Sequence, residues 1–270
     1  MAARLRAVRR PVYLYFRFLG QQMKAILAYE ADFVILLFAA VIIQVVGFAF
    51  IWTIFQRIPN INGWTLWQVL MMYSLIFITE GVVSLFFEGT WRLGWLVYSG
   101  QFDQMLVRPV SPILQVMAGA VGFNGLGNIV TGGVLFTISL TNVPMQWTPG
   151  RILMIPVLIA SAAMIRTALT LGAASSAFWI RNPFSMVPMF VHQLGEFAKY
   201  PITIYSVAVQ AVIVVAIPFA FVSFFPTAFL FGMDAWSLPG LLTPLVAVYC
   251  MVLAVWLFRH GMKNYESSGH

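Results

Sequence analysis

Long apolar stretches dominate this sequence and recur six times, with short polar segments between them. The stretches are Phe33–Phe55, Leu66–Phe87, Ile113–Leu140, Ile152–Ile180, Ile204–Phe225 and Leu241–Phe258. A helix needs about 20 mostly apolar residues to cross a bilayer, so each stretch predicts a transmembrane helix. We therefore expect an all-α integral membrane protein with six transmembrane helices, whose membrane domain covers residues 30–266.

The first 29 residues show a different, amphipathic pattern. Apolar residues recur there at intervals of three and four, while Arg6, Arg10, Arg17 and Lys24 occupy another face. This pattern is typical of a helix that lies in the membrane interface. A signal peptide is the alternative, but Arg17 interrupts its apolar region and no small-residue cleavage site follows.

Composition supports a membrane protein and excludes several chemistries. Of the residues, 61% are hydrophobic and 9% charged, whereas soluble domains carry roughly 25% charged residues. The single cysteine excludes an intrachain disulfide, and the three histidines lack metal-ligand spacing, so we expect no metal site. The net charge of +7 comes largely from residues that flank apolar runs. That placement favours contact with membrane lipids over nucleic acid.

The basic residues also predict the orientation in the membrane. With six spans, one side holds Arg4, Arg6, Arg9, Arg10, Arg17, Lys24, Arg92, Arg108, Arg181, Lys199, Arg259 and Lys263. The other side holds only Arg57 and Arg151, and Arg166 falls within a span. Because cytoplasmic loops are enriched in Lys and Arg, both termini are expected in the cytoplasm.

Two further segments depart from the simple pattern. Residues 226–239 are too apolar for an exposed loop and too short to cross, so they predict a re-entrant or interfacial turn on the outer side. We interpret the last four residues, 267–270, as the remnant of an expression tag and not as part of the membrane domain.

A glycine-rich stretch within the third predicted span suggests a nucleotide-binding loop at first sight. Gly119, Gly122 and Gly125 recur every third residue, which suits close approach of a neighbouring helix. A dinucleotide fingerprint would need a preceding strand and an aqueous pocket. The chain has no GxxxxGK[ST] motif, so it lacks the P-loop route to ATP hydrolysis.

Two opposite charges lie inside predicted spans. Glu80 and Arg166 are each about 14 residues into their helices, and both helices run from the outer side inward, which places both groups ~21 Å deep. Buried charges in membranes usually face protein or water, so the two could form an ion pair. The alternative is that each is satisfied separately. No catalytic constellation of acids, histidines or serines lies at one depth.

The segment SGQFDQMLVRPVSP, residues 99–112, joins the second and third spans. Gly100 permits a sharp turn, and Asp103 and Arg108 complement the dipole of a short helix that Pro109 ends. Phe102, Met105 and Leu106 would form an apolar knob suited to a partner's groove. A well-capped loop without a partner explains the same spacing.

Residues 100–109, GQFDQMLVRP, resemble the motif G-x-[hydrophobic]-[D/E]-x-x-L-x-[R/K]-P of ABC-2-type transporter permeases, in the compact branch described as ABC-2 family transporter protein. The similarity extends to the interfacial helix, the six spans and the outer turns. It implies the permease subunit of an exporter in the bacterial inner membrane. Such a subunit has no ATPase of its own and holds no cofactor.

The resemblance also implies partners and contacts. Two permease halves would pair over nucleotide-binding ATPase subunits, which hold the ATP and Mg²⁺. Gln101, Phe102, Asp103, Leu106 and Arg108 would contact the ATPase, with the loop at 181–201 nearby. The apolar walls favour a hydrophobic or amphipathic substrate. Two alternatives are a secondary transporter or channel and a membrane-embedded lipid-modifying enzyme. Internal repeats are the usual sign of secondary transporters, and we detect none in the sequence.

Overall fold

The computed structural model describes residues 13–24, 30–143, 148–180 and 186–266, and no β-strand occurs among them. A first helix covers residues 13–24. The others are α2 Glu30–Phe55, α3 Leu66–Phe87, α4 Leu93–Tyr98, α5 Gln101–Leu106, α6 Pro112–Met117, α7 Asn124–Asn142, α8 Pro149–Ala174, α9 Met186–Leu194, α10 Val207–Ala211, α11 Phe224–Leu230, α12 Asp234–Leu241 and α13 Thr243–Lys263. The expected interfacial helix is thus described only in part, and the suggested tag residues lie outside the described ranges.

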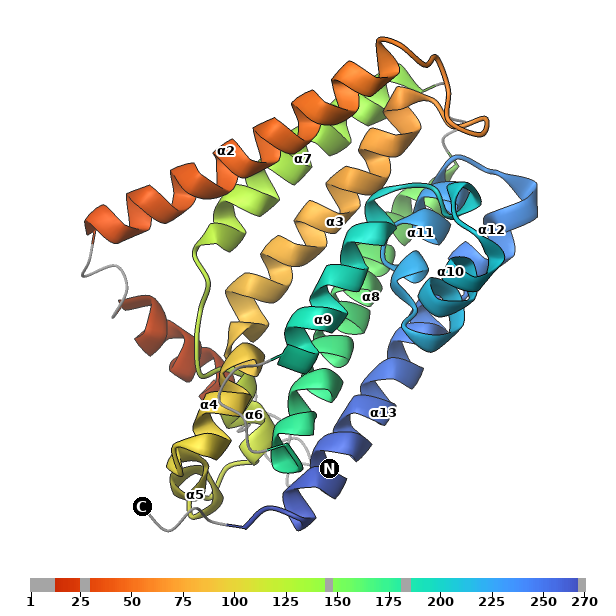
Figure 1. Cartoon of the computed structure of the whole chain (residues 1–270). Coiled ribbons are helices and arrows are strands. Elements are labelled where there is room, and N and C mark those ends of the chain that lie inside the picture. Colours follow the sequence, from red (N-terminus) through yellow and green to blue (C-terminus); the bar gives the residue numbers. More distant parts are fainter. Residues whose placement is uncertain (1–12, 25–29, 144–147, 181–185, 267–270) are drawn as a thin grey trace.

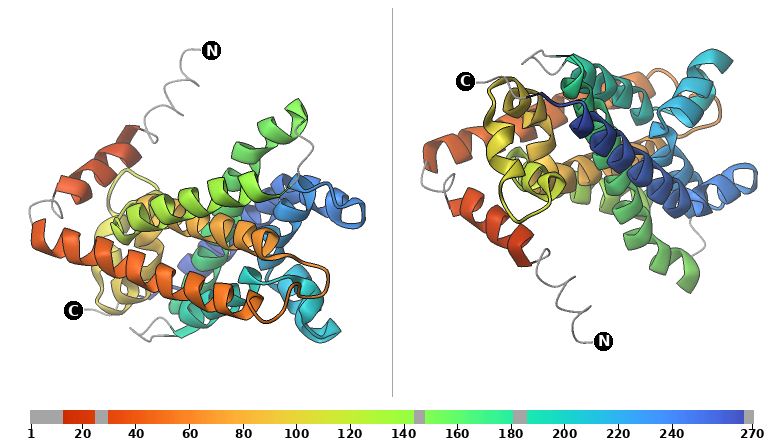
Figure 2. Two further views of the ribbon diagram at one scale, coloured as in Figure 1. Left: turned by 90° about the horizontal axis from the view of Figure 1, so that it is seen from above. Right: turned by 90° about the horizontal axis from the view of Figure 1, so that it is seen from below.

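The long helices form one bundle, shown in Figure 1 and from both ends in Figure 2. Its centre is α3 against α8; α7 packs on α3, α2 on α7, and α13 on α8. Helices α4, α5 and α6 and the C-terminal end of α13 lie at one end, which we call the coupling end. The turns around α11 and α12 lie at the opposite end.

Local sequence signals fix where the central helices begin. The backbone N–H of Thr65, just before α3, donates to the Gln68 side chain at 2.9 Å. The Thr148 hydroxyl accepts from the backbone N–H of Arg151 at 3.4 Å, and Pro149 opens α8. Such caps satisfy the N–H groups that a helix start leaves unpaired, so both helices begin close to the predicted residues.

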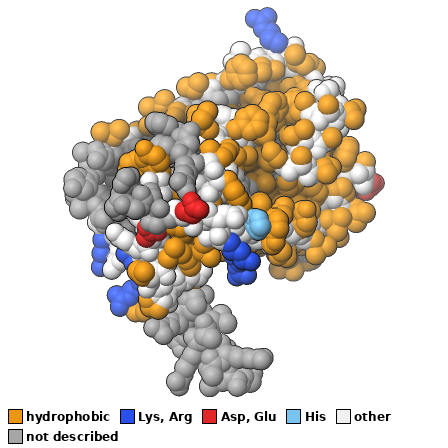
Figure 3. All heavy atoms as spheres, turned by 60° about the horizontal axis from the view of Figure 1, so that its bottom comes forward, with side chains coloured by type: hydrophobic (Ala, Val, Ile, Leu, Met, Phe, Trp, Pro, Cys, Tyr) orange, Lys and Arg blue, Asp and Glu red, His pale blue; other side chains and the backbone are white. Residues whose placement is uncertain are grey.

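Three helices of the described chain are long and apolar enough to cross a membrane: Leu66–Tyr98, Pro149–Phe178 and Thr243–Lys263. A pair of helices bent by 72°, Val207–Ala216 and Phe219–Leu230, would add a fourth. The chain is therefore an all-helical integral membrane protein, and the full count of six spans stays a prediction. Figure 3 shows the largely apolar surface that such a protein presents, with few charged side chains.

The third predicted span, Ile113–Leu140, is broken in the structure. Helix α6 ends at Met117 and α7 starts at Asn124. Residues 118–123 between them have no regular secondary structure. In this break the backbone N–H of Gly122 donates to the Ser84 carbonyl of α3 at 2.9 Å. Glycines weaken a helix and let backbones approach, which explains why the continuous apolar run does not give a continuous helix.

The fifth predicted span, Ile204–Phe225, is not one straight helix in the structure, and its limits differ from those predicted. The sequence assigned residues 186–199 to a loop, but helix α9 instead packs along α8 on the surface of the bundle, and the 3₁₀ turn Gly195–Lys199 contacts α3. Residues 207–230 then form the bent pair, whose break contains Pro218. Lys199, which the sequence analysis counted among the loop charges that predict the orientation, instead lies on the 3₁₀ turn with its ammonium group 5.4 Å from the centre of the Tyr73 ring.

Glycines bring α3 and α7 into close contact. A Cβ added at Gly125 of α7 would lie 2.6 Å from the Gly81 carbonyl oxygen of α3, and one added at Gly81 would lie 2.6 Å from that of Gly125. Neither backbone could stay in place with a larger residue. The glycine-rich stretch therefore serves helix packing at Gly125, as its spacing indicated.

Candidate functional site

The segment 99–112 forms a tight turn and a short helix at the coupling end. Gly100 adopts φ +71°, a left-handed conformation that favours glycine. Helix α5 follows at Gln101–Leu106, with Asp103 in its first turn, and Pro112 opens α6. The local structure is that expected from the glycine and the prolines.

The Phe102 ring does not project from α5 as the sequence analysis expected. It is fully buried and packs against the rings of Phe178, Phe258 and Tyr265, with centroids 5.3, 6.2 and 5.2 Å away. These partners follow α8, belong to α13 and follow α13, respectively. Burying a phenyl ring stabilises a fold by about 1.5–3 kcal/mol. The rings at the ends of α8 and α13 form an apolar site in which Phe102 gains this stabilisation. Phe102 is therefore an anchor for α5 and not part of an exposed knob.

The exposed residues of this segment lie at the start of α5 and around its C-terminal end. Leu106 is 44% exposed and Val107 84% exposed, and Gln101 and Arg108 also face outward, while Asp103 is half-buried. We call Gln101, Leu106, Val107 and Arg108 the outer edge of the coupling segment. Its apolar members are Leu106, as expected, and Val107, which the sequence analysis missed.

A buried amide holds the segment in shape. The Gln115 side chain of α6 donates from Nε2 to the carbonyl oxygens of Met105 at 2.9 Å and Val110 at 2.8 Å. These bonds tie both ends of the turn after α5 to α6. The segment is thus fixed to α6 through Gln115, and to α13 and the 3₁₀ turn after α8 through Phe102.

The two predicted intramembrane charges lie in contact within one chain. Arg166 Nη2 of α8 is 3.1 Å from Glu80 Oε1 of α3, and the Arg166 side chain is only 6% exposed. The same nitrogen is 3.1 Å from His192 Nδ1 of α9, and His192 Nε2 is 3.8 Å from the Glu80 carboxylate. The arginine therefore joins three helices around one charge pair.

This charge cluster opens on a polar cavity of about 210 Å³. Glu88, Ser84 and Asn124 also line the cavity, and the Ser84 hydroxyl donates to Glu88 Oε2 at 2.8 Å. The sequence analysis missed His192 because it assigned α9 to a loop. It also missed Glu88, although Glu80, Ser84 and Glu88 repeat every four residues on one helix face.

Neither site offers metal or catalytic chemistry in the described ranges. No group of three or more His, Cys, Asp or Glu side chains there is placed to hold a metal ion. What the structure shows at the two sites is a short helix anchored at one end of the bundle, and a Glu80–Arg166 ion pair that joins α3 to α8 and reaches His192 of α9.

Comparison with known proteins adds a family to this geometry. No curated protein and no solved structure matches the chain. Residues 41–269 match the family described as ABC-2 family transporter protein, a range that runs from within α2 past the end of α13. The chain belongs to the ABC-2 family of transporter proteins and is a membrane permease.

Proposed function

We propose that this chain is the permease subunit of an ATP-driven exporter, with ATP hydrolysed by a separate nucleotide-binding subunit. One observation carries the proposal: a short helix, rigidly anchored through Phe102, carries an exposed apolar edge at the coupling end of the bundle. Leu106 and Val107 offer apolar contact area, while Gln101 and Arg108 provide polar groups that orient the partner. An exposed apolar patch beside charged groups is a mark of a protein interface.

The anchoring supports energy transfer as well as binding. Since Phe102 contacts rings that belong to or follow α8 and α13, a push on α5 moves the ends of two candidate spans. A second permease half would complete the transport path, and the expected location is the bacterial inner membrane. ATP and Mg²⁺ would reside on the ATPase.

An apolar cavity supports a hydrophobic or amphipathic substrate. It measures about 310 Å³ and lies between α8, α9, the π-helical turn Val212–Ala216 and α13. None of the described residues that line it is charged. A cavity of this size holds part of an acyl chain or a fused ring system, whereas a bare ion would find no ligands there.

The proposal is tested by site-specific crosslinking in the native membrane. Cys250 is the single cysteine, so Cys250→Ala provides a background for one new thiol. Val107→Cys should crosslink to a protein that carries a P-loop, because Val107 is the most exposed apolar residue of the outer edge. The matched control is Ile58→Cys, an apolar residue with 48% exposure that follows α2.

The two thiols together decide the outcome. A P-loop protein crosslinked at residue 107 and not at residue 58 supports the proposal. Equal crosslinking at both positions, or none at residue 107 in cells that show transport, would remove the coupling segment as the ATPase contact.

A further inference from the structure

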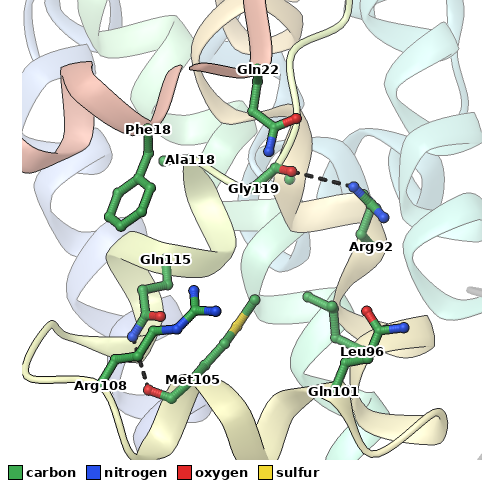
Figure 4. Close-up of a pocket in the computed structure, with 11 residues that line it drawn as sticks. Phe18, Gln22, Arg92, Leu96, Gln101, Met105, Arg108, Gln115, Ala118 and Gly119 are labelled. Carbon is green, nitrogen blue, oxygen red and sulfur yellow. Dashed lines mark hydrogen bonds between the residues drawn. The ribbon is translucent and has the colours of Figure 1, made fainter. Parts of the chain in front are cut away.

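A second polar pocket lies at the coupling end, separate from the intramembrane charge cluster. It measures about 200 Å³ and is enclosed by the helix at 13–24, the start of α4, α5 with the turn that follows, and α6. In Figure 4, Arg92 and Arg108 lie on opposite sides of the pocket, and Phe18 and Gln22 enter from the N-terminal helix. The pocket therefore joins the N-terminal helix to one continuous part of the chain, from Gly89 to Gly119.

The lining of this pocket is cationic. It contains the guanidinium groups of Arg92 and Arg108, and none of the described residues that line it is acidic. Arg92 Nη1 donates to the Gly119 carbonyl at 3.3 Å. A guanidinium has five N–H donors, so this bond leaves donors for a ligand. Both side chains are exposed, which keeps the site accessible.

A buried acceptor lies beside these donors. Gln115 donates from Nε2 to two carbonyl groups, while its Oε1 is buried and accepts no hydrogen bond from the described residues. An unpaired buried acceptor costs free energy, and a ligand hydroxyl would satisfy it. The two guanidinium groups and the Gln115 acceptor together suit a ligand that carries an anionic group and a nearby hydroxyl group. Guanidinium groups bind phosphate, like carboxylate, through parallel N–H···O bonds, and two arginines that face one pocket suit the multiple oxygens of a phosphate.

Exposed aromatic side chains beside the pocket favour a phosphate at the membrane surface. Trp95 and Tyr98 of α4 are each 48% exposed and flank Leu96, which lines the pocket. Exposed Trp and Tyr side chains mark the level of lipid headgroups. Phe16, on the helix that closes the pocket, is 59% exposed and offers an apolar surface for a lipid tail.

We propose that this pocket binds the phosphate of an anionic phospholipid whose headgroup carries a hydroxyl, of the phosphatidylglycerol type. Arg92 and Arg108 hold the phosphate, and the Gln115 carbonyl oxygen accepts from the headgroup hydroxyl. The bound lipid joins the N-terminal helix to the coupling segment. This site goes beyond the transport function and does not require the ATPase.

The test is a titration of the purified full chain in detergent, without any ATPase. The probe is dihexanoyl phosphatidylglycerol, and binding is measured by native mass spectrometry. Since each charge-assisted bond to phosphate contributes substantially, Arg92→Gln with Arg108→Gln should weaken binding at least about tenfold. Arg92→Lys with Arg108→Lys keeps the charge and should retain part of the binding.

A matched control removes the same charge from the same end of the bundle. Arg259→Gln with Lys263→Gln changes two exposed basic residues in the last turns of α13, outside the pocket, and should leave binding within about twofold. If this control weakens binding as much as the pocket variant, the attraction is diffuse and the site is refuted. If the double pocket variant does not fold, Arg108→Gln alone tests the site, because Arg108 is exposed.

Comparison probes identify the source of the phosphate. Dihexanoyl phosphatidylcholine, a zwitterion without a hydroxyl, should bind clearly more weakly than phosphatidylglycerol. Inorganic phosphate should not displace the lipid at equal concentration; displacement would make a soluble anion the ligand. Because the titration contains no ATPase, its failure leaves the proposed function unaffected.

Discussion

At the residue scale, Arg166 is the group on which the interior of the bundle depends. Its side chain is 6% exposed and lies within 3.1 Å of both Glu80 and His192. A buried guanidinium is stable only when its charge and N–H groups have partners. The ion pair therefore fixes how α3, α8 and α9 are placed against one another.

We expect Glu80→Gln to destabilise the protein by up to about 3–5 kcal/mol, because it leaves a buried cation without its counter-charge. Arg166→Met should cost a similar amount, and the double variant less than the sum of the two. A double-mutant cycle measured by thermal unfolding in detergent should give a coupling of about 1 kcal/mol or more. Strictly additive losses would show that the pair contributes no interaction energy.

The Glu196–Lys199 pair provides the control for this cycle. Its atoms are 2.5 Å apart, but the Glu196 side chain is 47% exposed. The Lys199 side chain is 15% exposed, but because the half-exposed carboxylate is screened by solvent, the same cycle on this pair should show weaker coupling than on the buried pair. Equal coupling in both pairs would argue against a special role for the buried arginine.

At the element scale, α5 is held by its buried face and presents its outer edge. The Phe102 ring sits among three other rings, and Gln115 ties the following turn to α6. A helix of six residues is too short to be stable alone, so tertiary contacts hold it. Phe102 thus anchors α5, while the exposed outer edge is formed by other residues of α5 and by the turn that follows it.

Phe102→Ala should lower the free energy of unfolding by about 3–5 kcal/mol, since it leaves a cavity among the rings of the cluster. Leu106→Ala, at a residue that is 44% exposed, should cost about 0.5 kcal/mol or less. Thermal unfolding in detergent compares the two. A Phe102→Ala variant as stable as wild type would mean that the ring does not anchor α5.

The contact of α3 with α7 gives a second test at this scale. Gly125→Ala places a Cβ 2.6 Å from the Gly81 carbonyl, so the helices must separate, at a cost of about 1–3 kcal/mol. On the same helix, an added Cβ at Gly133 meets nothing within 4 Å. Gly133→Ala should therefore be neutral or stabilising. If both variants unfold at the same temperature, close packing at Gly125 is not what holds these helices together.

At the scale of the whole molecule, the chain is a membrane permease of the ABC-2 family, and our proposal places its energy source on a separate subunit. Its family match covers residues 41–269, and the sequence contains no GxxxxGK[ST] motif. Two sites divide the work in our proposal: the outer edge receives motion at the coupling end, and the charge cluster keeps the central helices in register.

The purified chain alone should hydrolyse no ATP above the buffer background, because the groups that cradle the phosphates are missing. A phosphate-release assay on the pure protein measures this, and addition of the P-loop protein found by crosslinking should restore turnover. Vanadate-sensitive hydrolysis by the verified pure chain would contradict the assignment of this chain as a subunit without ATPase.

The sequence by itself determined the class of protein and several local features. Apolar runs of about twenty residues are long enough to cross a bilayer. Because only 9% of the residues are charged, they cannot cover a water-facing surface, so most of the surface must face lipid. Gly100 and Pro112 determined where the turn lies and where α6 begins, because their backbone limits act within a few residues. The depths of Glu80 and Arg166 followed from counting residues along helices.

Only the tertiary structure decided which surfaces face each other. Hydrophobicity predicts that Phe102 prefers an apolar site but not whether a partner or its own chain supplies one; the ends of α8 and α13 supply it here. Likewise, the chain folds α9 back along α8 and thereby brings His192 to Arg166, a contact between residues 26 apart. Such contacts depend on loop geometry and on competition among many apolar faces, which spacing along a single helix does not record.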